Sequence, residues 1–302
     1  MEIAELVGML SPQAPLAKSP TLHRELRIKT IRSSLMIEGN KLDEKTVTAI
    51  IDGKRVLGDI HDILEVENAK RAYDLIPELN PHSIDDLLRA HRTMMDGLVP
   101  EAGRFRGGNV GVFDGDALIH AGTPAAYVPE VMADIFGWLE ETSMHPLLAS
   151  CVFHFEFEFC HPFSDGNGRT GRLWHTLLLS KWRPALACLP IESTIRRRQE
   201  GYYEALAKSD AIGSSERFVE FMLEVIRDSI LPFSKPANEK ELTRARALDF
   251  FRERGDGSIS RLAEHLGCSK RSAERIVAGL KEEGSLERQG SARSGIWIVH
   301  EN

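Results

Sequence analysis

The sequence predicts a mainly α-helical protein built from two domains. Long amphipathic runs alternate with short turn-forming segments, and few stretches show the alternation of a strand, so helices are expected to predominate. A chain of 302 residues is long enough for two domains, and 42% hydrophobic residues provide for a buried core. The sequence contains no internal repeat.

Start and stop signals place the helices of the first domain. Gly39 suits the left-handed position that follows a helix, so the first helix is expected to end there. Ser83 can cap a helix through its side chain, with Asp86 three residues further on. The expected helices cover about 21–39, a run from 44, 61–73, a run from 83, 129–141, 146–160 and 169–182.

A β-hairpin is expected between Gly107 and Gly122. Val110 and Val112 alternate before Asp114-Gly115, which is a turn signal, and Leu118 and Ile119 follow it. Such a hairpin either covers the core or forms a flap beside an active site, and its position in the sequence does not decide between the two.

The richest chemistry lies in the twelve residues HPFSDGNGRTGR, from His161 to Arg172. His161 is a base that titrates near neutral pH, and Asp165 offers hard oxygen ligands for Mg²⁺. If the glycines open the following helix, backbone N–H groups converge at its N-terminus and form an anion site. Arg169 and Arg172 are three residues apart and can fork onto phosphate oxygens. The stretch therefore predicts a site for phosphate transfer.

A dinucleotide fold is the competing interpretation. Residues 166–171 read G-x-G-x-x-G, and four phenylalanines alternate before them as a strand would, with Glu192 about twenty residues on. However, the glycines follow His-Pro-Phe-Ser-Asp rather than a strand, and no βαβ pattern is repeated later. The dinucleotide interpretation is therefore rejected, and the absence of a Lys-Ser/Thr pair excludes a Walker P-loop.

The same twelve residues resemble, without a mismatch, the signature of the Fic family, His-x-Phe-x-(Asp/Glu)-Gly-Asn-Gly-Arg-x-x-Arg. The usual members of this family are protein adenylyltransferases. The resemblance extends over about 21–232, because Gly103-Arg-Phe-Arg106, the hairpin and Tyr202-Tyr203 also occur where the family has them. It implies a Fic-type helical domain over 1–232 with a β-hairpin flap, and it favours a helix for the phenylalanine-rich run.

The resemblance implies a transfer of AMP from ATP to a protein hydroxyl, with Mg²⁺ as cofactor. His161 would take the proton from a Ser, Thr or Tyr hydroxyl, and Asp165 would hold Mg²⁺. The anion cradle would consist of backbone N–H groups and an amide from Gly166, Asn167 and Gly168. Arg169 and Arg172 would bind the terminal phosphates. Phe163 would anchor the loop in the core.

The flap at about 107–122 would hold the target protein by strand addition, so that a hydroxyl points at His161. The target is not identified by the sequence, and the protein itself is one candidate. A purely structural hairpin remains the alternative.

A second short motif predicts restraint of the enzyme. Ser34-Leu-Met-Ile-Glu38-Gly39 resembles the inhibitory-helix motif of the family, Ser/Thr-x-x-x-Glu-Gly/Asn, here before the catalytic core. Ser34 and Glu38 lie one turn apart, so Glu38 could form a bidentate pair with Arg172 and occupy the guanidinium that holds the γ-phosphate. The alternative is an ordinary solvated helix face.

The segment 191–203 resembles the part of the family that lines the base pocket, Ile-x-x-Asn-Arg-x-x-Tyr-Tyr. Tyr202 or Tyr203 would border a purine. Arg198 stands where the family usually has Asn, which puts the identity of the base in doubt. The alternative is that Arg196 to Arg198 coat a solvated helix.

A linker is expected at 233–240, and 241–302 resembles a winged helix-turn-helix domain. Lys270, Arg271 and Arg275 lie near the start of its third helix and are candidate DNA contacts. The domain holds eleven Lys and Arg against ten Asp and Glu, a net charge of +1, which is low for a strong DNA binder. Dimerisation or target docking is the alternative use of the domain.

A cytoplasmic, reduced protein is expected. No apolar run reaches membrane-spanning length, the N-terminus lacks a secretory pattern, and four cysteines lack C-x-x-C spacing. Cys160 is expected to be a core residue rather than a nucleophile. A homo-oligomer is left open. Two other functions also remain open, a nucleotide-sensing DNA-binding regulator and removal of AMP from a modified target.

Overall fold

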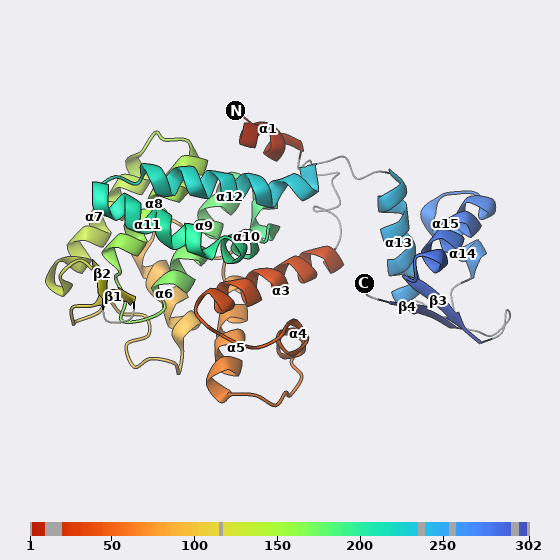
Figure 1. Cartoon of the computed structure of the whole chain (residues 1–302), viewed down its shortest axis with the longest axis horizontal. Helices are drawn as coiled ribbons and strands as arrows, with labels where there is room; N and C mark the ends of the chain where they lie inside the picture. The colour runs from red at the N-terminus through yellow and green to blue at the C-terminus, as the bar shows by residue number, and fades with distance from the viewer. Residues whose placement is uncertain are drawn as a thin grey trace. The chain divides into compact units, whose positions relative to one another are not determined.

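The computed structural model describes residues 2–9, 20–114, 117–234, 239–253, 258–290 and 296–300. The chain forms two compact units, Met1–Ser234 and Lys235–Asn302. Both are drawn in Figure 1. In the described part of the chain, no helix is long and apolar enough to cross a membrane.

Helices make up most of the first unit, as the sequence predicts, and the hairpin comes between α6 and α7 in the chain (Figure 1). The elements are α1 (Glu2–Met9), α3 (Pro20–Ile37), α4 (Glu44–Ile51), α5 (Ile60–Asp74), α6 (Ile84–Met95), β1 (Gly111–Asp114), β2 (Ala117–Ala121), the 3-10 helix η1 (Ala125–Tyr127), α7 (Val128–Glu141), α8 (Pro146–Cys160), α9 (Asn167–Trp182), the 3-10 helix η2 (Pro184–Cys188), α10 (Ile191–Arg197), α11 (Gln199–Ile212) and α12 (Glu216–Ser234).

The helices begin and end at the signals expected from the sequence. The Ser83 side chain accepts a hydrogen bond from the backbone N–H of Asp86 and caps α6. Gly39 has a φ of +94° just after α3, a left-handed conformation that a side chain would disfavour. This turn places Glu38 at the end of α3.

The phenylalanine-rich run forms helix α8, and its alternation has a physical cause. Residues two apart lie on nearly opposite sides of a helix. Phe153 and Phe157 pack into one hydrophobic cluster with α5, α6 and α9, while Phe155 packs into another with α11 and α12. Because α8 is buried on both sides, the helix shows the period of a strand.

The expected hairpin is present as the antiparallel pair β1 and β2. Val112 faces His120 in the register, and the register shifts between Val112 and Phe113. The turn at 115–116 lies outside the described residues.

The second unit contains three helices followed by two antiparallel strands. They are α13 (Glu239–Glu253), α14 (Ile259–Leu266), α15 (Lys270–Glu282), β3 (Leu286–Gln289) and β4 (Ile296–Val299). Phe251, Leu262, Val277 and Trp297 belong to a hydrophobic core of its own.

The expected linker at 233–240 is too wide. Helix α12 continues through Pro232 to Ser234, and α13 already begins at Glu239. Pro232 lies in the last turn of α12, where a missing N–H removes only one helical hydrogen bond. Residues 235–238, the rest of the expected linker, lie outside the described residues.

Candidate active site

His161 lies directly after α8 in a left-handed conformation, with a φ of 51°, and it is the only residue other than glycine with positive φ in the described part of the chain. Its Nδ1 atom lies 3.3 Å from the backbone oxygen of Glu158. Because a carbonyl oxygen can only accept, Nδ1 carries a hydrogen, and Nε2 is the ring nitrogen that could take a proton from a substrate. The backbone thus fixes the tautomer that a general base needs.

Arg106, from the Gly103-Arg-Phe-Arg106 motif, fixes the end of α8. Its guanidinium donates to the backbone oxygens of His161 at 2.7 Å and Cys160 at 3.3 Å. It also donates to Gly108 and Thr123, which flank the hairpin. Arg106 is 3% exposed, so this network is shielded from water and ties the hairpin to the histidine.

The loop from Phe163 to Asn167 is closed by the Asn167 side chain. Its Oδ1 accepts from the N–H of Phe163 at 2.8 Å, and its Nδ2 donates to the oxygen of Phe163 at 2.9 Å. Both polar atoms of this amide have partners within the loop, but Nδ2 has a second N–H, so its part in the anion cradle stays a prediction. Phe163 is fully buried, as expected for an anchor.

His91 is a site residue that the sequence reasoning missed. Its ring stacks on Phe163 with centroids 3.6 Å apart. Nδ1 accepts from the N–H of Gly103, and Nε2 lies 2.9 Å from the backbone oxygen of Asp165. The ring is therefore neutral with its hydrogen on Nε2, and burial lowers the pKa of His91 to about 4. This buried ring holds the loop that carries Asp165.

Gly166 turns the chain into α9 with a φ of 81°, and a Cβ at this position would lie 2.5 Å from the Met95 sulfur. Helix α9 then begins at Asn167. Its first N–H groups lack carbonyl partners within the helix, which is the backbone arrangement that anion sites at helix N-termini use. The expected anion site at the glycines therefore has the required backbone.

Arg169 forms ion pairs with two carboxylates, and its predicted contact with a phosphate stays a prediction. Its guanidinium bridges Glu65, at 2.5 Å, and Asp165, at 3.1 Å. Glu65 also accepts from the Asn40 side chain. Because Arg169 is buried between two carboxylates, it orients Asp165, whose side chain remains 55% exposed. No signal in the sequence identifies Glu65 as its partner.

Arg172 contacts the predicted inhibitory motif. Its guanidinium donates to Glu38 Oε1 at 2.7 Å, and to the side-chain and backbone oxygens of Ser34 at 3.1 Å each. Glu38 thus receives one hydrogen bond rather than the expected bidentate pair, because other guanidinium donors go to Ser34. A Cβ at Gly168 would lie 2.5 Å from Glu38 Oε1, so this glycine leaves room for the contact.

Of the two tyrosines expected near a base, only Tyr203 is accessible, with 48% of its surface exposed. Tyr202 is 1% exposed, and its hydroxyl lies 3.1 Å from His154 Nε2. Its ring is therefore enclosed in the core and cannot border a ligand. Gln199, one turn before Tyr203, donates to the backbone oxygen of Ile37 at the end of α3.

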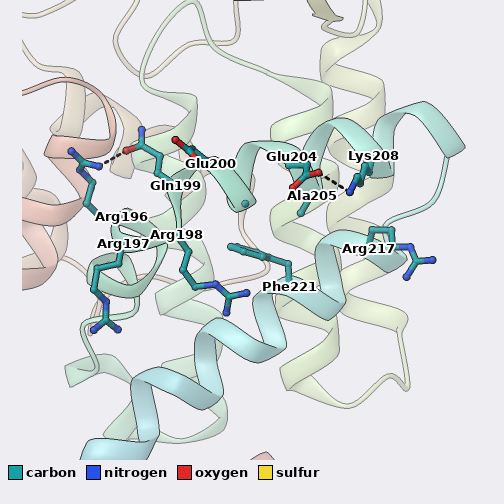
Figure 2. A pocket seen from close by; sticks show the side chains of 11 residues that line it. Arg196, Arg197, Arg198, Gln199, Glu200, Glu204, Ala205, Lys208, Arg217 and Phe221 are labelled. Atoms are coloured by element: carbon teal, nitrogen blue, oxygen red, sulfur yellow. Dashed lines mark hydrogen bonds and ion pairs between the residues drawn. The ribbon is translucent and has the colours of Figure 1, made fainter.

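Arg198 is the residue that departs from the family pattern. Its side chain points toward α12. It pairs with Glu224 at 2.7 Å and Asp228 at 3.5 Å, and its guanidinium lies over the Phe221 ring. Figure 2 shows Arg198 beside Phe221. Both residues line a surface groove between α11 and α12, which has a volume of about 640 Å³. The ion pairs account for the arginine without a ligand.

In the second unit, Lys270, Arg271 and Arg275 are all exposed along α15. The same helix buries Ala273 and Val277 in the core of its unit. The three predicted DNA contacts are therefore solvent-accessible side chains.

Comparison with known proteins places residues 81–179 in the family described as Fic/DOC. The crystal structure of a Fic family protein from Desulfovibrio desulfuricans G20 is 43% identical, with a TM-score of 0.76, over 100% of this chain and 94% of that one. Protein adenylyltransferase fic-1 of Caenorhabditis briggsae is 30% identical over 69% of this chain. A structure of Fic-1 from C. elegans is 26% identical, with a TM-score of 0.62, over 76% of this chain and 69% of that one. The chain spans only 42% of the C. briggsae protein.

Proposed function

The chain belongs to the Fic/DOC family, and we propose that it is a protein adenylyltransferase that transfers AMP from ATP to a Ser, Thr or Tyr hydroxyl of a target protein. The observation that carries the proposal is His161, whose Nδ1 faces the Glu158 carbonyl so that Nε2 is left for a substrate, in the loop that leads from α8 into α9. Relatives named protein adenylyltransferase support it.

In the proposed reaction, His161 Nε2 takes the proton of the target hydroxyl while the hydroxyl oxygen attacks the α-phosphorus. The bond between the α-phosphorus and the bridging oxygen to the β-phosphate breaks, and pyrophosphate leaves. Backbone N–H groups at the start of α9 and the guanidinium of Arg172 would bind the phosphate oxygens.

Asp165 suits a magnesium ion. Its carboxylate is half-exposed, is oriented by Arg169, and offers the hard oxygens that Mg²⁺ prefers. When bound, the ion would supply positive charge against the charge of the departing pyrophosphate. His91 would support the same residue, because it holds the Asp165 backbone.

The Glu38–Arg172 contact supports autoinhibition. A carboxylate 2.7 Å from the guanidinium competes with a phosphate for the same donors, so ATP could not place its γ-phosphate there until Glu38 leaves. Inhibition is thus a competition between two anions for one arginine.

The target would be held by the hairpin. Strands β1 and β2 pair only with each other within the described residues, and the outer edge of a two-stranded hairpin can accept a third strand. Arg106 ties both flanks of this hairpin to the carbonyl of His161. A purine would lie near Tyr203 rather than Tyr202.

Intact-mass spectrometry of the full chain with Mg²⁺ and ATP tests the reaction and its restraint together. The variants are wild type, Glu38→Gly, and Glu38→Gly combined with His161→Ala. We expect AMP adducts in Glu38→Gly, few in wild type and none without His161. The matched control is Glu78→Gly, which breaks an exposed pair with Arg89 and should behave as wild type.

Adducts that persist without His161 would contradict the proposed base, and equal labelling of wild type and Glu38→Gly would contradict inhibition. If no variant becomes labelled, incubation of Glu38→Gly with a cell extract and labelled ATP provides the second measurement. Absence of His161-dependent labelling there as well would contradict the proposed transferase.

A second candidate function, DNA binding by the second unit, is favoured by the exposed Lys270, Arg271 and Arg275. Three phosphate contacts would make the affinity for DNA fall with salt, with a log–log slope of about −3. Replacement of Arg271 and Arg275 by Glu should abolish this binding in an anisotropy titration. Equal affinity of the variant and wild type would exclude these residues as contacts.

A further inference from the structure

Next to the Glu38–Arg172 pair lies a buried carboxyl group that the proposed reaction does not use. Glu158 is in the last turn of α8, three residues before His161. Its side chain is 10% exposed, and its Oε1 atom is buried without a hydrogen-bond partner. A carboxylate oxygen buried without a hydrogen-bond partner disfavours the ionised form, so the charge state of Glu158 depends on its neighbours.

Two glycines of α9 make room for carboxyl groups next to Arg172. A Cβ at Gly171 would lie 2.7 Å from Glu158 Oε1, and a Cβ at Gly168 would lie 2.5 Å from Glu38 Oε1. Because Gly168 and Gly171 are three residues apart, they share one face of the helix. Glu38 and Glu158 therefore approach the same face of α9, which also carries the Arg172 guanidinium.

Groups from four directions face Glu158. They are His154 and His161 from the α8 segment, Arg172 from α9, Glu38 from the end of α3, and Tyr202 and Tyr203 from α11. Burial lowers the pKa of His154 to about 3, so this histidine is neutral. The pKa values of both tyrosines are raised by burial, so these stay neutral too.

Burial raises the pKa of Glu158 to about 7, while His161 and Arg172 lower it and the negative charge of Glu38 raises it further. The carboxyl group can therefore gain or lose a proton near neutral pH when the charge beside it changes.

We propose that Glu158 takes up a proton from solvent when the triphosphate of a nucleotide replaces Glu38 beside Arg172, and that nucleotide affinity therefore depends on pH. The inference rests on the nucleotide site proposed above. A triphosphate carries more negative charge than the single carboxylate of Glu38. An ionised Glu158 would repel it in a poorly solvated site, and protonation removes this repulsion without moving a side chain.

Isothermal titration calorimetry of the full chain at pH 7.5 tests the proposal. The probe is α,β-methylene-ATP, which cannot transfer AMP, and two buffers with different ionisation enthalpies give the number of protons taken up. All proteins in the comparison carry Glu38→Gly, and the variant with this substitution alone is the background. Removal of Glu38 leaves Glu158 more fully ionised before the ligand binds. The comparison is with Glu38→Gly/Glu158→Gln.

The matched control is Glu38→Gly/Glu156→Gln. Glu156 lies on the same helix, and burial raises its pKa as well, but Arg172 is not among the groups that shift it. We expect uptake of up to about one proton in the background and in this control, and less than half of that uptake in the Glu158 variant. Between pH 6.5 and 8.5, Kd should rise by up to about tenfold per pH unit only where Glu158 is present.

Equal proton uptake in all three proteins would overturn the role of Glu158 while leaving the nucleotide site intact. Failure of the Glu38→Gly protein to bind the analogue would overturn both. If Glu158→Gln does not fold, infrared difference spectra of Glu38→Gly alone decide the question. Ligand binding should add the C=O band of a protonated carboxyl group, and its absence would overturn the proposal.

Discussion

His91→Phe is expected to destabilise the first unit strongly at pH 7.5 and much less at pH 5. The substitution keeps a ring against Phe163 but removes the acceptor of the Gly103 N–H and the donor to the Asp165 oxygen. Each buried backbone group left without a partner costs about 1–3 kcal/mol, so for these two groups we expect a loss of about 2–6 kcal/mol at pH 7.5.

The pH dependence follows from the low pKa of His91, about 4 in the folded protein against 6.5 for an ordinary histidine. Between these values the unfolded chain binds the proton more strongly, so the folding contribution of the neutral ring falls as the pH drops below 6.5. At pH 5 this linkage lowers the free energy of unfolding of wild type by about 2 kcal/mol, and it lowers that of the Phe variant by nothing at this position. The difference in unfolding free energy between wild type and variant should therefore be smaller at pH 5 by that amount.

Urea unfolding followed by tryptophan fluorescence, at pH 7.5 and pH 5, measures the gap. The control is His82→Phe, since His82 is exposed and its replacement should change little at either pH. A wild-type minus His91→Phe gap that is the same at both pH values would refute the assignment of a neutral, buried His91.

Three further predictions concern single side chains. Asn167→Asp should lower stability by about 1–3 kcal/mol in thermal or urea unfolding, because the donor to the Phe163 oxygen is lost; unchanged stability would contradict the loop geometry. Arg198→Asn should leave the preference for ATP over GTP unchanged in competition binding, because Arg198 faces α12; a changed preference would place it in the base site. Cys151, fully buried with a pKa raised by burial to about 12, should resist iodoacetamide at pH 8 while the partly exposed Cys268 reacts; peptide mapping would reveal early labelling of Cys151 as a contrary result.

The motif, turn and helix-start residues of the sequence predicted those parts of the site that are contiguous in the chain. The twelve residues from His161 to Arg172 carry the helix end, the loop and the next helix start, so their relative placement follows from a few turns of backbone. The contact between Glu38 and Arg172 spans 134 residues, and it was anticipated only through the resemblance to a family motif.

The parts that were missed depend on contacts between distant segments. His91 lies 74 residues from the loop it supports, and Glu65 lies 104 residues from Arg169. A single buried His or Glu in an amphipathic helix has no spacing that identifies its partner. The two hydrogen bonds that close the loop through the Asn167 amide were not anticipated either, because a sequence does not show how a short loop folds back on itself.

Arg106 connects the hairpin to His161 and thereby also fixes how far the hairpin lies from this histidine. One guanidinium joins Gly108 and Thr123, on either side of the hairpin, to Cys160 and His161. A target strand paired with the hairpin would be positioned by backbone register relative to the base. Since alternate side chains of a strand face the same way, a slip of one residue would turn the hydroxyl away and a slip of two would present a different one. Under the proposed function, the protein would then select the modified residue by its position along an extended segment, largely independently of the neighbouring side chains.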